Sequence, residues 1–307
     1  MPRRSKSDAA YHRGVPVLTL LTDPTRPTLT PADVEEAGRG RGAGPPRWLS
    51  PGAAVEVDVE PGTELDEQLR DDWQRRGVDL VLQPDGERRR PVLLADMDST
   101  MIEQECIDEL AAYAGVGDLV AAITARAMDG ALDFEAALRE RVALLRDLPI
   151  HVVDTVLRER ITLTPGGPAL VATTRAHGGY AALVSGGFTV FTEVLAGRLG
   201  FDEHRANTLE VHDGRLTGQV VPPVVGREAK VAALREISAR AGLTPGDVLA
   251  VGDGANDVPM LRLAGTGVAL HAKPSVARAV DVRVQRGDLT ALLYLQGYAD
   301  AQIVRPS

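Results

Sequence analysis

Two carboxylates separated by a single residue, Asp96 and Asp98, come directly after the apolar run of residues 91–95. This run is typical of a strand buried in a parallel sheet, and ligands of such sheets bind beyond the carboxyl ends of the strands. Burial of two neighbouring like charges is costly unless a cation or a proton lies between them. The pair therefore predicts a metal site, with one carboxylate as a nucleophile and the other as an acid/base group.

Two further apolar runs also end in segments that suit chemistry on a phosphate. One leads into residues 185–187 (Ser-Gly-Gly), whose hydroxyl and unshielded N–H groups can bind phosphate oxygens. The other leads into residues 252–257, where Asp253, supported by Asp257, offers the hard oxygen ligands that Mg²⁺ prefers. Because all three segments follow predicted strands of one parallel sheet, we expect them to converge as loops at one edge.

Lys230 lies at the start of a predicted helix, in a chain whose positive charge comes mainly from arginine. Most lysines are solvated surface groups, but a lysine beside these loops can neutralise charge on a transferring phosphoryl group. We therefore expect Lys230 to bind phosphate, while the neighbouring Arg227 faces solvent.

These segments resemble the four signature motifs of the haloacid dehalogenase superfamily, and within it the phosphoserine phosphatase family. The similarity covers roughly residues 92–293 and extends into a helical insert, at Glu105, at residues 128–130 (Met-Asp-Gly) and at residues 134–149. It implies an α/β fold, with a Rossmann-like three-layer core around a parallel sheet and a helical-bundle cap inserted after the first core strand. The motifs are Asp96-Met97-Asp98-Ser99-Thr100, Ser185-Gly186-Gly187, Lys230 and Gly252-Asp253-Gly254-Ala255-Asn256-Asp257.

The resemblance also implies a reaction, the Mg²⁺-dependent hydrolysis of O-phospho-L-serine through an aspartyl-phosphate, which is the last step of serine biosynthesis. Asp96 corresponds to the nucleophile and Asp98 to the general acid/base. Asp96, the Asp98 backbone carbonyl and Asp253 would hold Mg²⁺, while Asp257 would orient Lys230 and metal-bound water. The phosphate would be bound by Ser185, Gly186 and Lys230, with Asn256 nearby.

In the cap, the resemblance assigns Glu105 to the substrate ammonium and Arg141 to its carboxylate, with Met128 and Phe134 closing over the substrate. An acid and an arginine able to bind in a bidentate manner are the groups that a selective phosphoserine pocket needs. From the residues alone, Glu105 and Arg141 could equally be solvated helix positions, and Met128 and Phe134 could be ordinary cap packing.

The order of expected elements divides the chain into a small N-terminal unit and a larger α/β unit. Residues 1–14 are expected to be a disordered tail and residues 85–90 a polar linker. Residues 15–84 follow the order β-α-β-β-α-β of the ferredoxin-like pattern, with helices starting at Thr30 and Thr63. This α+β unit suggests an ACT-like regulatory domain, for which feedback by L-serine is only a hypothesis. The core is expected over residues 91–101 and 161–307, and the cap over residues 102–160.

Composition excludes several other classes of function. The 307 residues carry a net charge of −9 and only 4% are aromatic, which argues against a nucleic-acid-binding surface. No apolar run approaches the length of a membrane span. Cys106, the only cysteine, allows no intramolecular disulfide and is expected to be packing. We therefore expect a cytoplasmic enzyme with a small-molecule substrate, and a homodimer is left open.

Two other functions stay open at this point. The same aspartyl-phosphate could pass its phosphoryl group to an alcohol acceptor instead of water, because the Asp98 acid/base serves either outcome. A catalytically inactive, ligand-sensing protein is disfavoured because all the expected catalytic groups are present.

Overall fold

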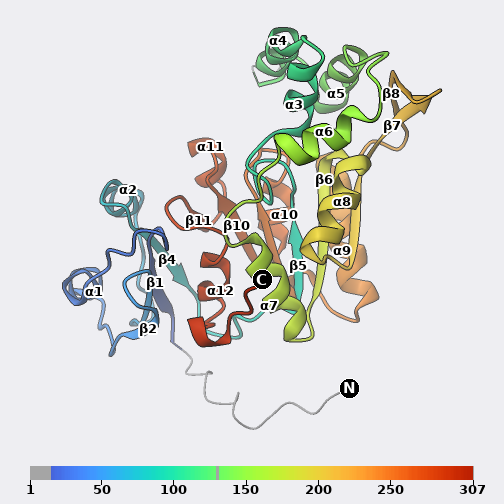
Figure 1. The fold of residues 1–307 in the computed structure, drawn as a ribbon. Coiled ribbons are helices and arrows are strands. Elements are labelled where there is room, and N and C mark those ends of the chain that lie inside the picture. The colour runs from blue at the N-terminus through green and yellow to red at the C-terminus, as the bar shows by residue number, and fades with distance from the viewer. Residues whose placement is uncertain (1–14, 129–130, 307) are drawn as a thin grey trace.

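A mostly parallel sheet forms the centre of the molecule (Figure 1). The computed structural model describes residues 15–128 and 131–306, so the tail predicted for residues 1–14 lies outside it. Seven strands lie in the order β11-β10-β9-β5-β6-β7-β8, and only the β7–β8 pair is antiparallel. Their bounds are β5 (Val92–Ala95), β6 (Tyr180–Phe188), β7 (Glu203–His212), β8 (Arg215–Val221), β9 (Val248–Gly252), β10 (Thr266–Leu270) and β11 (Val282–Val284).

Helices cover both faces of this sheet, which gives the predicted three-layer core. Strand side chains alternate between the two layers: Leu93 and Ala95 belong to one apolar cluster, and Val92 and Leu94 to the other. Among the described residues, no helix combines the length and apolarity that a bilayer span requires. The first layer contains α7 (Gly167–Ala176), α8 (Thr189–Leu199) and α12 (Ala291–Leu295), and the second contains α9 (Arg227–Arg240), α10 (Val258–Leu263) and α11 (Pro274–Ala277).

Four helices between β5 and β6 form a cap on the side of the sheet where β5 ends (Figure 1). They are α3 (Cys106–Tyr113), α4 (Gly117–Met128), α5 (Phe134–Ala143) and α6 (Val152–Glu159). The helical character predicted for this insert is confirmed. Asp133 caps α5, because its side chain accepts a hydrogen bond from the N–H of Ala136. A hairpin turn at Asp213-Gly214 joins β7 to β8, and these strands reach the cap.

The N-terminal unit has the predicted element order and a four-stranded antiparallel sheet, β2-β3-β1-β4. Thr30 forms the expected capping box with Asp33. The start of the second helix at Thr63 was wrong: Thr63 donates to Glu60 O in a turn, and Asp66 caps the helix through the N–H of Leu69. The elements are β1 (Val17–Leu21), α1 (Pro31–Gly38), β2 (Arg47–Ser50), β3 (Ala54–Asp58), α2 (Glu67–Arg75) and β4 (Asp79–Gln83).

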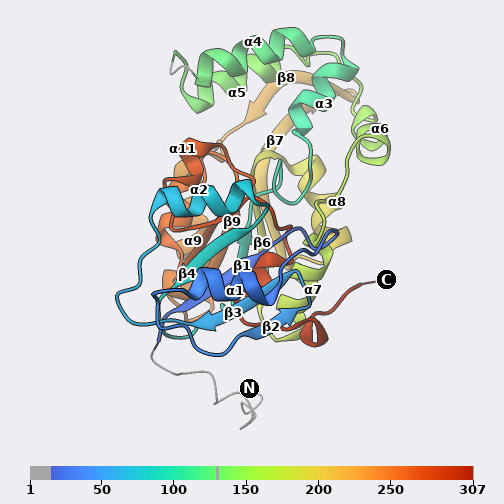
Figure 2. The same cartoon turned by 90° about the vertical axis from the view of Figure 1, so that its left-hand side faces the viewer.

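This unit contacts the core through β4, which lies beside β11. Figure 2 shows the N-terminal unit from the side that faces away from the core. The buried Asp79 carboxylate Oδ2 accepts hydrogen bonds from the backbone N–H groups of Gln285, Arg286 and Gly287, at 2.9, 2.7 and 3.2 Å. The two units therefore share a polar, buried junction in addition to apolar packing.

Candidate active site

The adjacent strands β9, β5 and β6 end at a common cavity of about 150 Å³, which the cap covers. The core supplies its floor and α3 and α5 of the cap supply the facing side chains. Nine of the residues singled out from the sequence line this cavity: Asp96, Asp98, Glu105, Phe134, Arg141, Ser185, Gly186, Asp253 and Asn256.

Lys230 is fully buried and contacts two carboxylates at once. Its Nζ lies 2.6 Å from Asp96 Oδ2 and 2.6 Å from Asp257 Oδ1. Burial alone would lower the pKa of Lys230, but the charges of Asp257 and Asp96 outweigh it and raise this pKa. The second Asp257 oxygen, Oδ2, accepts from the N–H of Gly254 at 3.0 Å. Asp257 thus has both oxygens engaged within the protein and holds the ammonium against Asp96.

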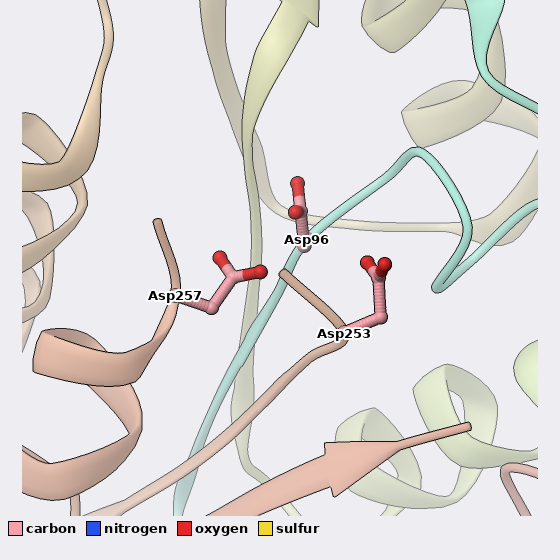
Figure 3. A group of neighbouring side chains, drawn as sticks. All are labelled: Asp96, Asp253 and Asp257. Carbon is pink, nitrogen blue, oxygen red and sulfur yellow. The ribbon is translucent and has the colours of Figure 1, made fainter. Parts of the chain in front are cut away.

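Three carboxylates from two segments of the chain lie close together (Figure 3), and two of them contact the Lys230 ammonium. Asp96, Asp253 and Asp257 each offer one ligand atom, and these atoms all lie within 4.8 Å of one another. Burial, followed by the negative charge of Asp96, raises the pKa of Asp253 to about 7 and that of Asp257 to about 7. Such a crowded, buried set of hard oxygens fits a divalent cation. This cluster differs from the metal ligands expected from the sequence in one member. The cluster contains the Asp257 side chain, and the expected set has the Asp98 backbone carbonyl in its place.

Asp98 has a separate environment from Asp96. Its Oδ1 accepts a hydrogen bond from the N–H of Cys106, the first residue of α3, at 3.0 Å. Burial, with the charges of Glu105 and Asp96, raises the pKa of Asp98 to about 8. This carboxyl can therefore carry a proton at neutral pH, as a general acid must.

The phosphate-binding segment predicted as a loop after β6 is instead the irregular end of that strand. Strand β6 continues to Phe188, with a register shift between Val184 and Phe188 where it pairs with β7. The shift lets the buried Ser185 Oγ accept a hydrogen bond from the N–H of Gly187 at 2.9 Å. Because that oxygen is the acceptor, the Ser185 hydroxyl hydrogen remains available as a donor.

Two charged cap residues face the core groups across the cavity. Glu105 accepts a hydrogen bond from Ser99 Oγ at 2.8 Å, and burial raises its pKa. Arg141 on α5 is half-buried and donates from Nε to the carbonyl of Ala137 at 3.2 Å. Phe134 begins the same helix, whereas the side chain of Met128 and residues 129–130 lie outside the described part of the chain.

Several residues of the site were given no role from the sequence. Ser99 and Thr100 belong to the first motif, and Thr100 Oγ1 donates to Asp253 Oδ1 at 3.2 Å. The cap residues Ile107 and Leu138 line the cavity, but their apolar helical pattern does not differ from that of ordinary core positions. Asn207, which hydrogen-bonds two site segments, lies in a polar stretch where no strand was predicted.

Comparisons with known proteins agree with this geometry. The haloacid dehalogenase-like hydrolase family matches residues 93–262. The chain is 44% identical over 249 residues to a phosphoserine phosphatase of Streptomyces coelicolor. This match covers 80% of this chain but only 60% of the length of the relative. It is 45% identical to a phosphoserine phosphatase of Lactococcus lactis, covering 69% of this chain and 98% of that one.

The fold also resembles a solved structure with a similar arrangement over nearly its whole length. This is a probable phosphoserine phosphatase from Vibrio cholerae in its unliganded form, with a TM-score of 0.77 and 34% identity. The match covers 95% of this chain and 89% of that one, so it includes the N-terminal unit as well as the core.

Proposed function

The chain belongs to the haloacid dehalogenase-like hydrolase family, and we propose that it hydrolyses O-phospho-L-serine to L-serine and phosphate. The observation that carries the proposal is the pairing of two sets of groups across one small cavity. The core side offers phosphate-binding groups, and the cap side offers one acid and one arginine. Phosphoserine has the three charged groups that these two sets complement: a phosphate, an ammonium and a carboxylate.

Asp96 is the proposed nucleophile. Its Oδ1 accepts from the N–H of Met97 at 2.7 Å and its Oδ2 pairs with Lys230, so the carboxylate is held in one orientation. Attack of an Asp96 oxygen forms an O–P bond as the bond from phosphorus to the serine oxygen breaks. Lys230 and the hydroxyl of Ser185 then lie where they can stabilise the phosphoryl oxygens.

Asp98 handles the protons in both halves of the reaction. The protonated carboxyl gives its proton to the leaving serine oxygen, and the resulting carboxylate takes a proton from the water that attacks the aspartyl-phosphate. That water releases phosphate and restores Asp96 and the Asp98 proton, so the cycle closes without another reactant. The raised pKa of Asp98, about 8, supports the first of these roles.

Asp96 and Asp253, with the Asp98 carbonyl, are the groups that we propose to hold Mg²⁺. When bound, Mg²⁺ supplies positive charge that stabilises the transferring phosphoryl group. Asp257 keeps its contacts with Lys230 and Gly254, and Thr100 holds Asp253 through its hydroxyl. These contacts fix the carboxylates before substrate enters.

Phosphate release from O-phospho-L-serine in the presence of Mg²⁺ tests the proposal directly. We expect turnover by the wild-type protein and its loss in Asp96→Asn, because an amide cannot form the aspartyl-phosphate. A matched control is Asp154→Asn, an exposed position on α6. Adding an alcohol separates hydrolysis from transfer, since transfer would lower phosphate release and yield a new phosphate ester. An inactive wild-type protein, or an undiminished Asp96→Asn variant, would refute the proposal.

Selectivity tests the cap half of the site. Arg141→Ala should raise KM for phosphoserine by about 100-fold, because a charge-assisted, bidentate contact with the carboxylate is lost. Hydrolysis of an aryl phosphate, which has no such carboxylate, should change little. Arg139→Ala is the matched control, because Arg139 lies on the same helix and pairs with Glu135 near the surface. Equal losses on both substrates would contradict the assignment of Arg141.

A further inference from the structure

Asn207 on β7 ties together two segments of the site that are not otherwise paired by the strand ladder. Its Nδ2 donates to Gly186 O at 2.8 Å and to Val225 O at 3.2 Å, and its Oδ1 accepts from Val225 N at 2.7 Å. The side chain is fully buried, and these contacts use both of its donors and its acceptor group. Asn207 therefore acts as a cross-link between the irregular end of β6 and the segment that leads into the Lys230 helix.

The cross-linked segments each present a glycine to the cap residue Phe134. A Cβ at Gly186 would lie 3.1 Å from Phe134 Cζ, and a Cβ at Gly226 would lie 3.1 Å from Cδ1 and 3.3 Å from Cε1 of the same ring. These distances are shorter than a normal carbon–carbon contact of about 3.5–4.0 Å. The ring thus lies across both glycines, so closely that an added Cβ at either position would push against it. We call Gly186 and Gly226 the glycine seat.

We propose that Asn207 is a positioning residue that holds the glycine seat rigid, so that docking of Phe134 and formation of the phosphate-binding segment depend on each other. The inference rests on the proposed function, because it assigns phosphate binding to Ser185 and Gly186. Asn207 is not among the residues that line the cavity, and it acts through the backbone of Gly186 and Val225. The seat in turn gives the cap a fixed docking point directly above the phosphate.

An asparagine suits this position because the two segments present two acceptors and one donor. The acceptors are the carbonyls of Gly186 and Val225, and the donor is the N–H of Val225. Gly186 lies within the register shift of β6, where it is paired with no residue of β7, and the Asn207 amide donates to its carbonyl. A buried backbone group without a partner is costly, so loss of the amide would let Gly186 move away from its position. Since Gly186 N–H belongs to the same residue, its direction toward the phosphate would change as well.

Asn207→Asp tests the cross-link with little change in volume. The variant keeps an oxygen for the Val225 N–H but replaces the donating NH₂ group, so the contacts with two carbonyls are lost. We expect the dissociation constant for inorganic phosphate, measured by calorimetry with Mg²⁺ present, to rise about tenfold or more. KM for phosphoserine should rise with it, while stabilisation by Mg²⁺ alone stays unchanged. Thr208→Ala, at the exposed next position of β7, is the control.

A phosphate affinity within about twofold of wild type in folded Asn207→Asp would overturn the proposal. So would loss of Mg²⁺ stabilisation in parallel with phosphate affinity, because that result indicates general damage to the site. If this variant does not fold, the glycine seat provides the second test.

Gly226→Ala tests whether the seat acts through Phe134. Gly226 has an extended backbone, so the new methyl group meets the ring without added backbone strain. We expect the dissociation constant for inorganic phosphate to rise about tenfold in this variant, and the effect to disappear in a Phe134→Ala background. Gly197→Ala on α8 is the control, since nothing lies within 4 Å of its added methyl group. An unchanged effect of Gly226→Ala in the Phe134→Ala background would refute the seat.

These tests remain separate from the proposed function. Binding of inorganic phosphate and its double-mutant cycle with Phe134→Ala need no turnover of phosphoserine. A wild-type protein that binds phosphate but does not hydrolyse phosphoserine would refute the proposed substrate. The phosphate affinity of Asn207→Asp would still decide the role of Asn207, and the cycle would still decide the role of the glycine seat.

Discussion

At the scale of single residues, Gly187 lies very close to Asp98, the carboxyl proposed as the acid/base group. A Cβ at Gly187 would lie 2.4 Å from Asp98 Oδ2 and 2.8 Å from Met97 Cε. Met97 is fully buried and cannot move away easily, so the added methyl group must displace Asp98. The absence of a side chain at Gly187 therefore serves the position of Asp98 and not only the approach of phosphate.

Gly187→Ala should lower kcat on phosphoserine by about 100-fold, because a displaced acid no longer reaches the leaving oxygen. KM should change by less than about tenfold, since Lys230 stays in place and Ser185 Oγ, 3.2 Å from the added Cβ, needs to move only slightly. Steady-state kinetics with Gly197→Ala as the matched substitution provides the measurement. A kcat close to that of the wild type would show that Asp98 can relax, and would contradict its assigned position.

The charged residues of the site were foreseeable from the sequence, but several residues that orient them were not. Asp96, Asp253 and Lys230 stand at strand exits or a helix start, where residue type and position alone suggest chemistry. Asn207 gives no such signal, because its role depends on its hydrogen bond to the Gly186 carbonyl, which lies within the register shift of β6. That shift is a property of strand pairing in space, which a single sequence does not display.

At the scale of elements, the β7–β8 hairpin holds the cap from outside the cavity. Three backbone hydrogen bonds join its tip to the segment after α5: Asp147 N to Leu216 O at 2.8 Å, Leu216 N to Leu148 O at 2.9 Å and Ile150 N to Gly214 O at 2.9 Å. The cap is therefore attached to the core by this hairpin as well as by its two chain connections. Local opening of the cap must break these bonds or move the hairpin with it.

Gly218→Ala should loosen this attachment. Gly218 has a φ of +79°, and a Cβ there would lie 3.1 Å from Arg146 Cβ and 3.2 Å from Ala143 O. Gly242→Ala, after α9, is the control, because its φ is +72° but nothing lies within 4 Å of its added methyl group. Both variants lose about 1–2 kcal/mol from left-handed backbone strain. Only Gly218→Ala should also speed amide hydrogen exchange at Asp147 and Leu216, and equal exchange in the two variants would contradict the attachment.

Most elements could be predicted from apolar patterning, and the differences have physical reasons. The buried strands of the core and the helices of the cap lie where their periodicity indicated. The first half of β7 was missed, because residues 203–206 are half-buried and polar and show no alternation. The second helix starts at Glu67, because Asp66 was the better cap for its first turn and Thr63 was used in a turn instead.

At the scale of the whole molecule, Asp79 determines how firmly the N-terminal unit is held on the core. Asp79→Ala should lower the free energy of unfolding by about 3 kcal/mol, because it leaves three backbone N–H groups of residues 285–287 without their buried acceptor. Asp72→Ala should cost no more than about 1 kcal/mol, since its pair with Arg75 is largely solvated. Denaturant titration of both variants provides the measurement. A similar loss of unfolding free energy in the two variants would contradict a stabilising role for the Asp79 contacts.

The crowding of carboxylates in the site also couples the stability of the whole molecule to pH and Mg²⁺. The pKa values of Asp98, Asp253 and Asp257 are raised from 3.8 to about 8, 7 and 7 in the metal-free fold. The folded state therefore binds more protons than the unfolded state between these limits, and the contribution of these groups to stability falls as pH rises through that window. Lys230, whose pKa is raised, stays charged throughout and adds no slope there.

Mg²⁺ should reverse this loss if it is held as proposed, because it would bind the ionised carboxylates that repel one another in its absence. We expect the rise in melting temperature on adding Mg²⁺ to be several degrees larger at about pH 8 than at about pH 5, where protons compete with the metal. Asp253→Asn removes one of the repelling charges, so it should be more stable than the wild type without metal at about pH 8 and should respond weakly to Mg²⁺. Melting curves at both pH values, with and without Mg²⁺, distinguish these outcomes. An equal Mg²⁺ effect at both values would mean that the carboxylates are already ionised in the metal-free fold, and that burial does not set their protonation.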